Sequence, residues 1–511
     1  MAEKVTLKKF ALVQIFCFLA AIFWFYFVMA PWRSLIHSDN AVPFSMTLEP
    51  WRMQDLYYWG AARMGLLYEI IWKLFTHPGA GLSPQIGSRL NTELFYFVHT
   101  ALFFIGMGAW LLCFTRIRSA IIFVLLMTPL TEPWVDCFLL AGQPYGILFL
   151  LSGLFFLTLL HGPKNQIKRQ LTLGFLISLL WIQHELSGFL SFMTYIFWEV
   201  DYREVFARRS WIALAKRYRP FLTIWTALMV VAYIFKTFSS RWSDGNHYDF
   251  VHRTEIIDNF SNLFKRGIEV EGTKLPGIFL VLIIAVIMQS LWKRITTHKS
   301  TLQEQGMFTV LAGCSLCVLV INFTHWHAIN LRPARYYLNL VPVIIFIGLK
   351  FSESQLSRRA RAIVLFFLLA MVIDIQRPEA WIWDHEARAA DVRGDNEEAR
   401  CNSEVPARAH SCRVARMERF DRKVELLERK GCYLYLDNYW ESHSLTAVSD
   451  GKIRASSFDF IRNPELYYDI VRGPKFCAGE VVGATLHSDA FKAFDCKFLP
   501  EKIYVCERKK S

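Results

Sequence analysis

The chain has 511 residues, of which 54% are hydrophobic and 20% are charged, and it contains 43 Phe and 17 Trp. Soluble domains are about 45–50% apolar and about 25% charged, so this composition is typical of a polytopic membrane protein and argues against a soluble enzyme or a disordered chain. The formal net charge of +13 does not indicate nucleic-acid binding, because residues 376–511 hold 23 basic and 23 acidic residues and the whole excess lies in residues 1–375, between apolar runs.

Eleven stretches are apolar enough to be interpreted as membrane spans, for which about 17–25 residues are needed. They are residues 10–30, 94–114, 119–131, 146–160, 171–184, 186–199, 220–236, 276–292, 306–322, 338–350 and 362–375. The first is expected to stay in the protein as a signal anchor, because no small-residue cleavage pattern precedes Pro31. The sequence therefore predicts an α-helical polytopic membrane protein with about eleven transmembrane helices.

The basic residues predict the orientation of these spans. The N-terminus and every second loop hold 21 Lys and Arg, whereas the opposite loops hold 13 in about twice the length. Because positive charge is retained on the cytoplasmic side, we expect a cytoplasmic N-terminus in the inner (plasma) membrane. An odd number of spans then places the C-terminal segment outside the cytoplasm.

The first outer loop, residues 31–93, is far longer than a usual connection, so we expect it to have structure of its own. Residues 66–75 (LLYEIIWKLF) place apolar side chains on one helical face, and aromatic residues such as Tyr57, Tyr58 and Trp59 suit the headgroup layer. These features predict helices that lie in the membrane interface. A packed extracellular cap is the alternative.

Asp39 is the candidate for chemistry in this loop. It follows the first span by a few residues, within SDNAVPFSM (residues 38–46), where a carboxylate meets lipid headgroups. A carboxylate there can deprotonate an acceptor hydroxyl as a general base, or hold a metal against a phosphate. The alternative is a solvated loop carboxylate or a helix N-cap, since Ser38, Asp39 and Asn40 are all capping residue types.

Two later outer segments also carry polar groups. TEPWVDCFLLAGQPYG (residues 131–146) offers Glu132 and Asp136 as a second acid, with Gln143 nearby; a helix cap or break at Glu132 is the alternative. Residues 322–342 contain Arg332 and Arg335, which suit a lipid phosphate through bidentate bonds, although interfacial arginines also anchor spans. His325 and His327 form an HxH pattern there, which is a weak metal signal.

The C-terminal segment is expected to form a linker, residues 376–414, and a small α/β domain, residues 415–511. A helix is predicted over 415–430, ended by Gly431, with strands over 432–440, 481–486 and 502–506. Six cysteines lie in this segment: Cys401, Cys412, Cys432, Cys477, Cys496 and Cys506. They predict disulfides and an oxidising compartment, with 15 connectivities left open; no CxxC pair supports the competing zinc site.

Residues 1–375 resemble the GT-C superfamily of membrane glycosyltransferases. The resemblance is to the bacterial branch of protein O-mannosyltransferases and lipid A aminoarabinose transferases, and it depends on two motifs. One is the span followed by SDNAVPFSM, YYWG, an arginine and an amphipathic helix; the other is RYYLNLVP (residues 335–342), an Arg-Tyr before an apolar span with Pro.

This resemblance implies that Asp39 is the catalytic base or a metal-associated carboxylate, and that Glu132 or Asp136 supplies a second acid. It also implies that Arg335 and Arg332 bind the donor phosphate, and we expect Tyr58, Arg63 and Gln143 to contact acceptor or donor. Asn40 stands where many relatives have a second acid, so the sequence requires no cofactor, although a divalent metal is compatible with it.

The resulting hypothesis is an inverting glycosyltransferase of the outer membrane face. It would move a sugar from a polyprenyl-phosphate donor to a hydroxyl of a lipid, glycan or protein acceptor, with membrane lipids around it and no nucleic-acid partner. The absence of a Gly-rich nucleotide-binding motif agrees with a lipid-borne donor. The alternatives are a transporter or flippase of a lipid-linked envelope precursor, and a non-catalytic envelope scaffold.

Overall fold

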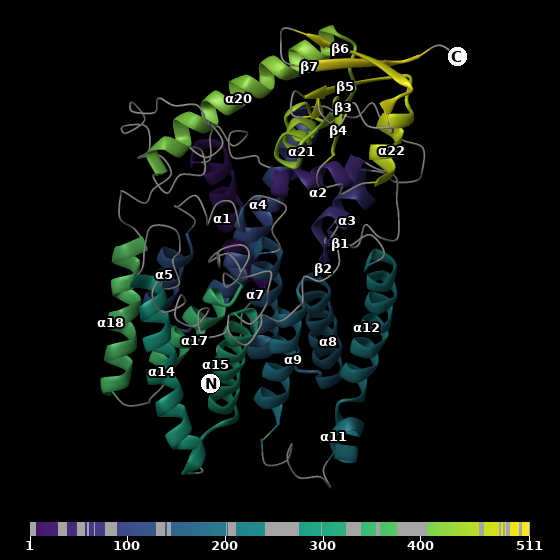
Figure 1. Ribbon diagram of the computed structural model, residues 1–511. Helices are drawn as coiled ribbons and strands as arrows, with labels where there is room; N and C mark the ends of the chain where they lie inside the picture. Colours follow the sequence, from purple (N-terminus) through teal and green to yellow (C-terminus); the bar gives the residue numbers. More distant parts are fainter. Residues whose placement is uncertain are drawn as a thin grey trace, which may run out of the picture.

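The protein is represented by a computed structural model that describes residues 7–28, 38–48, 57–58, 61–65, 67–76, 89–128, 138–139, 145–200, 202, 211–240, 275–297, 299–322, 339–353, 358–375, 406–458, 464–479, 482–483, 486, 491–499 and 503–509. It consists of a bundle of long helices and a small α/β domain (Figure 1). A layer of short elements from the first long loop lies between them. We refer to the end of the bundle that meets this layer as the domain-facing end.

Each of the eleven apolar stretches coincides with a helix of the bundle. The helices are α1 (Leu7–Phe23) with its π-helical continuation η1 (Trp24–Val28), α4 (Arg89–Leu112), α5 (Ile117–Met127), α7 (Tyr145–His161), α8 (Gln166–Gln183), α9 (Glu185–Glu199), α12 (Arg219–Ser240), α14 (Leu275–Thr296), α15 (Leu302–Asn322), α17 (Val341–Glu353) and α18 (Arg358–Ile375). A short helix, α11 (Trp211–Arg217), precedes α12. The helical character of these stretches is therefore confirmed.

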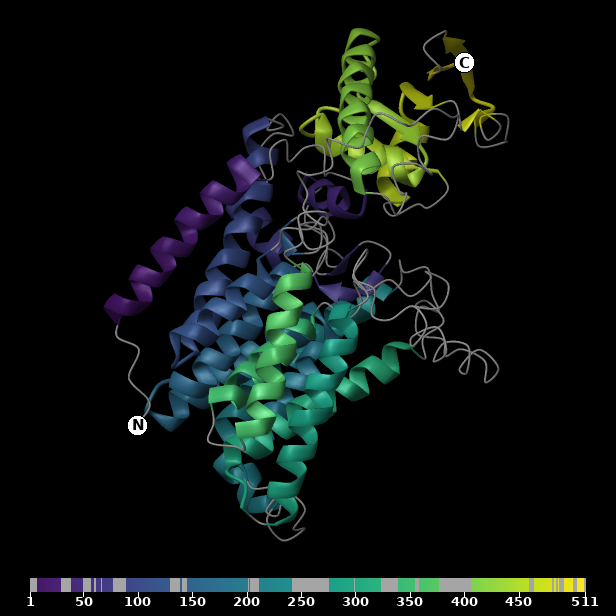
Figure 2. The ribbon, with the colours of Figure 1, turned by 90° about the vertical axis from the view of Figure 1, so that its left-hand side faces the viewer.

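Small residues and aromatic rings together set the packing of the bundle. α4 lies against α1, purple beside blue in Figure 2, and against α7, while α9 lies against α8 and α15. A Cβ on Gly106 of α4 would lie only 2.7 Å from the Leu150 Cα of α7, so only glycine allows this approach. The buried Trp110 Nε1 donates a hydrogen bond to the Phe149 carbonyl, 3.0 Å away, which ties the same two helices together.

Two helices in the described part of the chain are long and apolar enough to cross a membrane by length and composition. They are Phe10–Phe27, of which 17% is buried, and Thr92–Leu112, of which 67% is buried; shorter apolar helices occur at Ile117–Met127, Tyr145–His161 and Arg219–Ile234. A signal sequence and the core helix of a soluble protein meet the same criteria. The structure is consistent with a membrane protein, and the count of eleven spans stays a prediction.

Large apolar side chains point outward from several helices of the bundle. Examples are Phe16 on α1, Ile117 on α5, Phe175 on α8, Tyr233 on α12, Trp292 on α14, and Phe366 and Ile373 on α18. Soluble monomers expose such residues singly and seldom in extended patches. The outer surface of the bundle is therefore apolar on many sides.

Ion pairs join helix ends at the opposite end of the bundle, away from the α/β domain (Figure 1). They are Arg169 with Glu199, which links α8 to α9, Arg294 with Glu304, which links α14 to α15, and Lys350 with Glu353 at the end of α17. Glu353 also accepts hydrogen bonds from the Thr115 hydroxyl and the Arg116 backbone N–H between α4 and α5. The loops that the sequence predicts to be cytoplasmic thus gather at one end.

The first long loop does form its own structure, as the sequence predicts. It contains α2 (Ser38–Leu48), a hairpin of β1 (Tyr57–Tyr58) and β2 (Ala61–Gly65), and α3 (Leu67–Thr76). β2 lies beside α8 and α12, whereas α2 packs against α3 on one side and against the α/β domain on the other (Figure 1). These elements make the layer between the two parts.

The C-terminal domain is a three-layer α/β structure. Its elements are α20 (Pro406–Arg429), β3 (Leu434–Asp437), α21 (Tyr439–Val448), β4 (Arg454–Ser457), α22 (Pro464–Arg472), β5 (Lys475–Gly479), β6 (Phe494–Leu499) and β7 (Ile503–Arg508). The strand order is β4-β3-β5-β7-β6, with β3 parallel to β4 and β5, and β7 antiparallel to β5 and β6. Apolar residues of α20 and α21 cover one face of the sheet, and those of α22 cover the other.

The sequence predictions for this domain are confirmed in part. The helix over 415–430 is α20, which begins inside the stretch expected as linker, and Gly431 (φ +66°) ends it, with the Cys432 N–H bonded to the Leu427 carbonyl at 2.8 Å. The strand over 502–506 is β7. The strand over 481–486 is wrong, because β5, residues 475–479, pairs with both β3 and β7, and the described residues 482, 483 and 486 lie outside strands.

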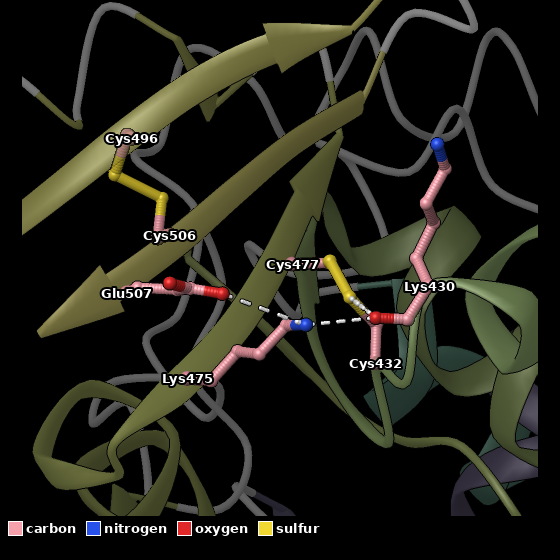
Figure 3. Close-up of a disulfide and its surroundings, with 7 residues drawn as sticks. All are labelled: Lys430, Cys432, Lys475, Cys477, Cys496, Cys506 and Glu507. Atoms are coloured by element: carbon pink, nitrogen blue, oxygen red, sulfur yellow. Dashed lines mark hydrogen bonds and ion pairs between the residues drawn. A yellow bond between two sulfur atoms is a disulfide. The ribbon is translucent and has the colours of Figure 1, made fainter.

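Two of the predicted disulfides are present (Figure 3). Cys432 pairs with Cys477, which ties the entrance of β3 to β5, and Cys496 pairs with Cys506 across β6 and β7. The side chains of Cys401 and Cys412 lie outside the described ones. Cys17, Cys113, Cys314 and Cys317 in the bundle are buried and free, as expected for apolar packing residues. The disulfides agree with an oxidising compartment for the domain.

Candidate functional site

Asp39 lies in the first turn of α2, in the layer between the bundle and the C-terminal domain. The following residues of this helix are buried from Ala41 to Thr47, and the Phe44 ring meets the Phe95 ring of α4 edge-on, with centroids 5.5 Å apart. A carboxylate in the first helical turn is favoured by the partial positive charge of the helix N-terminus. The fold therefore places the Asp39 backbone at a helix N-terminus, in the layer between the two parts of the chain.

Pro43 gives the first turn of α2 an unusual backbone. Proline has no N–H, so the carbonyl of Asp39, four residues earlier, lacks the helical hydrogen bond it would otherwise accept. An 11-residue helix with one missing bond has little stability of its own. The position of Asp39 consequently depends on what α2 packs against.

The neighbouring helix α3 buries polar side chains against α2 and α4. The Tyr68 hydroxyl donates to the Phe95 carbonyl, and the Lys73 ammonium donates to the Met46 carbonyl of α2 at 3.1 Å. Both side chains are about 2% exposed. The sequence predicted this segment as a helix of the membrane interface with an apolar face, and Ile71 of that face is exposed.

Glu69 is the most unusual group of this layer. Its side chain is 6% exposed, and burial raises the pKa of its carboxyl group from 4.5 to about 8. The carboxyl group makes no ion pair within the described part of the chain. At neutral pH it is therefore protonated, and it can donate a hydrogen bond or a proton, which an ionised carboxylate cannot.

Sequence reasoning missed Glu69. It is one charged letter within the amphipathic run of residues 66–75, where an exposed polar face is the ordinary expectation. The only signal in the sequence was the pair Glu69 and Lys73, spaced four residues apart on one helical face within an otherwise apolar run. Such a pair is usually solvated.

A second cluster of polar side chains lies at the domain-facing end of the bundle, where α8 ends and α9 begins. Gln183 of α8 accepts a hydrogen bond from the Leu67 N–H at the start of α3, 3.2 Å away. Asn339, just before α17, donates to the Ser187 hydroxyl of α9 at 3.0 Å, and the His184 Nδ1 lies 3.5 Å from the same amide nitrogen. The short elements are thus joined to the bundle by polar bonds.

A small cavity opens beneath Asn339. It is lined by Ser152 and Phe156 of α7, Ser187, Leu190, Ser191 and Thr194 of α9, and Asn339 and Val343 at the start of α17. Its volume of about 10 Å³ is the space of roughly one water molecule. The Asn339 side-chain oxygen, which is buried, has no hydrogen-bond partner among the described residues. The cavity is too small for a sugar or a lipid chain.

The predicted site residues fall into two groups. Tyr58 lies in β1, directly opposite Ala61 in the hairpin, and Arg63 lies in β2, so the layer that holds Asp39 also holds their backbones. Glu132, Asp136, Gln143, His325, His327, Arg332 and Arg335 lie outside the described residues. Their expected roles stay predictions, as does the meeting of Asp39 with a second acid from that set.

Within the described residues, no group of three or more His, Cys, Asp or Glu is arranged to hold a metal ion. Because Glu132, Asp136 and the two histidines of the HxH pattern are not among those residues, metal dependence also stays open. No protein-family model matches the chain, and no curated protein matches it. The resemblance to GT-C glycosyltransferases therefore depends on the quoted motifs alone.

Proposed function

We propose that this protein is an integral-membrane glycosyltransferase that moves a sugar from a polyprenyl-phosphate donor to an acceptor hydroxyl on the extracytoplasmic face of the membrane. The observation that carries the proposal is the position of Asp39. It lies in the first turn of a helix held between an apolar helical bundle and a disulfide-bonded domain, next to the helix that carries the buried Glu69. A lipid-borne donor and a water-borne acceptor would meet at such a boundary.

The exposed apolar side chains of the bundle support its insertion in a bilayer. Lipid chains would cover residues such as Phe16, Tyr233 and Phe366, which in water would be costly to expose together. The gathering of basic helix ends at the end away from the C-terminal domain supports a cytoplasmic location for that end. The disulfides support an oxidising compartment for the domain.

In the proposed reaction, Asp39 takes the proton of the acceptor hydroxyl as that oxygen attacks the anomeric carbon. The bond between this carbon and the phosphate oxygen breaks, polyprenyl phosphate leaves with the electron pair, and the configuration of the sugar inverts. Arg335 and Arg332 would stabilise the phosphate charge. Glu69, neutral at pH 7, would donate a hydrogen bond within the same layer, and Tyr58, Arg63 and Gln143 would contact donor or acceptor.

A transporter of a lipid-linked envelope precursor is the second candidate, because one observation favours it. Ser187, Ser191 and Thr194 recur along α9 at intervals of four and three residues and line the cavity inside the bundle. Transporters place polar groups within the bundle in this way. However, these three residues carry hydroxyl groups and none of them is charged. This favours chemistry at the surface over transport through the bundle.

The proposal is tested by comparing cell-envelope glycans by mass spectrometry in three strains. These are a deletion, the deletion restored with the wild type, and the deletion restored with Asp39→Ala at an equal membrane level. We expect the deletion to lose a glycoform that the wild type returns and Asp39→Ala does not. Full restoration by Asp39→Ala would remove Asp39 from the site and favour a transporter or a scaffold.

A further inference from the structure

We propose that the C-terminal domain is part of the catalytic unit, and that its helix α21 positions α2, and with it Asp39, through the contact between Gly451 and Leu48. This inference rests on the proposed function. It assigns Gly451 and Leu48 as positioning residues, which act through Asp39 and touch no substrate. It also gives a reason why a disulfide-bonded domain follows a membrane bundle in one chain.

The first observation is the burial of α21 between its own sheet and α2. Leu445 and Val448 belong to the core of the α/β domain, whereas Ala447 belongs to the core of the bundle, together with Ala41 and Phe44 of α2. Every side chain from Ser442 to Ser449 is buried, although five of the eight are polar. One short helix therefore contributes to two cores, and the two parts of the chain share a continuous packed interior (Figure 1).

α2 carries several small buried side chains, and one of them, Ala41, belongs to the same core as Ala447 of α21. Ala41 and Ser45 are both buried, and the Ser45 hydroxyl donates to the Ala41 carbonyl of its own helix, 3.1 Å away. The Thr47 hydroxyl bonds in the same way to the Phe44 carbonyl. Because these hydroxyls are satisfied within α2, they can pack against α21 without an unpaired polar group.

The turn that ends α21 presses on the end of α2. The Asp450 and Gly451 N–H groups bond to the Ala447 and Thr446 carbonyls at 3.1 and 2.8 Å, in the pattern of a Schellman cap, with φ +55° at Asp450 and +78° at Gly451. A Cβ on Gly451 would lie 2.7 Å from the Leu48 Cδ1 atom. The positive φ favours glycine here, and a Cβ would in addition displace the end of the Leu48 side chain.

These contacts matter because α2 cannot hold its first turn alone. Pro43 removes the hydrogen bond to the Asp39 carbonyl, and the helix has only 11 residues. On its other side, α2 is held by the Lys73 bond to Met46 and by the ring contact of Phe44 with Phe95. Removing the support from α21 would leave α2 attached on one face only, and the carboxylate of a general base must be held closely in place.

The chain offers a matched control for Gly451. Gly431 ends α20 with φ +66°, so alanine imposes similar backbone strain there, yet its Cβ would meet only the Lys475 Nζ atom, 4.0 Å away. Gly451→Ala and Gly431→Ala therefore differ mainly in the contact with α2. Leu48→Ala shortens the side chain that a new Cβ would strike, so the double variant Gly451→Ala/Leu48→Ala relieves the clash.

Activity is measured with purified full-length protein in proteoliposomes, with polyprenyl-phosphate sugar lipids extracted from the source cells as donor and an extract of the same cells as acceptor. We expect Gly451→Ala to lower kcat at least tenfold with the KM for donor changed less than twofold, because Asp39 moves and the donor site does not. Gly431→Ala should stay within twofold of the wild type. The double variant should recover at least half of the lost rate.

Hydrogen exchange of the α2 amides supplies a readout that needs no transfer activity. We expect the amides of Val42 and of Phe44 to Leu48 to exchange at least tenfold faster in Gly451→Ala than in Gly431→Ala, and to return toward the wild-type rate in the double variant. Equal exchange in the two single variants would overturn the inference. If exchange changes as expected while the wild type transfers no sugar, the proposed function fails and the support of α2 by α21 stands.

Discussion

The helical bundle and the C-terminal domain both bury an apolar core, but they differ in the side chains that they expose. In the bundle, large apolar residues such as Phe366 and Tyr233 lie on the outside, while polar groups such as Ser187 and Asn339 lie inside. In the domain, apolar side chains line both faces of the sheet and charged residues such as Lys423 and Glu441 pair at its periphery. The contrast is consistent with the proposed surroundings, lipid for the bundle and water for the domain.

The candidate site lies where these two arrangements meet. α2 joins the core of the bundle through Phe44 and packs on the domain through its contact with α21. Asp39 is therefore at the boundary of the two environments, and so is the neutral Glu69. Four predictions test the contrast.

The largest effect is expected from Asp39→Asn, which keeps the size of the side chain and removes its basicity. Loss of a general base typically lowers the rate by about 10² to 10⁴-fold. We expect that fall in kcat, with unchanged thermal stability, in proteoliposomes supplied with donor lipid. Asn40→Ala is the control, and an equal loss in that variant would assign the effect to the turn and not to the carboxylate.

The next effect concerns Glu69, whose folded-state pKa of about 8 lies above the ordinary value of 4.5. The stability that this neutral, buried carboxyl group contributes is fully present below pH 4.5. It is lost as the pH rises through 8, since burying the ionised form is costly. Glu69→Gln should remove this slope and stabilise the protein above pH 8 by at most about 5 kcal/mol, at 1.36 kcal/mol per unit.

Thermal unfolding from pH 4 to pH 9 measures this effect. If the wild type and Glu69→Gln have parallel stability curves over that range, Glu69 is ionised in the native protein. In that case it would not serve as the neutral hydrogen-bond donor of the proposed site.

A smaller loss of stability is expected from breaking the Cys432–Cys477 disulfide, and this loss should be confined to the C-terminal domain. The bond closes a sequence separation of 45 residues, so Cys432→Ser/Cys477→Ser should destabilise the domain by about 2–4 kcal/mol. Cys314→Ala/Cys317→Ala in the bundle, where both thiols are free, is the control. Limited proteolysis that finds the domain equally resistant in both variants would show that the disulfide contributes little.

The last of the four predictions separates lipid from water as the surroundings of the bundle. Phe366, at the middle of α18, and Phe498, on β6, are both at least half exposed. In a bilayer, Phe366→Lys should cost about 2.5–3.5 kcal/mol and lower the membrane-inserted yield, whereas Phe498→Lys should change little. Equal yields of the two variants would mean that water, not lipid, surrounds α18.

The sequence predicted the helices of the bundle well because long apolar runs have few other outcomes. A stretch such as residues 146–160 (GILFLLSGLFFLTLL) is too long for a strand and too apolar for a loop, and it forms α7. The strands of the C-terminal domain were harder to predict. β4, with the sequence RASS, has no apolar alternation, and it is a strand because it pairs in register with β3, a contact between residues 20 positions apart that no local pattern encodes.

The candidate site was predictable only in part. Asp39 was found because a motif marked it, and α2 begins where that motif does. Glu69 was not found because its burial depends on partners distant in sequence, such as the Phe95 carbonyl that binds the adjacent Tyr68. The support of α2 by α21 was equally hidden, since it joins residues 48 and 451.

The most direct test of the central claim is to follow the donor lipid itself. Purified protein in sealed proteoliposomes would receive polyprenyl-phosphate sugar lipids from the source cells, with and without an acceptor extract, and mass spectrometry would identify the lipid at the end. The account predicts free polyprenyl phosphate, formed only when acceptor is present and not formed by Asp39→Asn. An intact donor that has merely moved to the other leaflet would contradict it and identify a transporter.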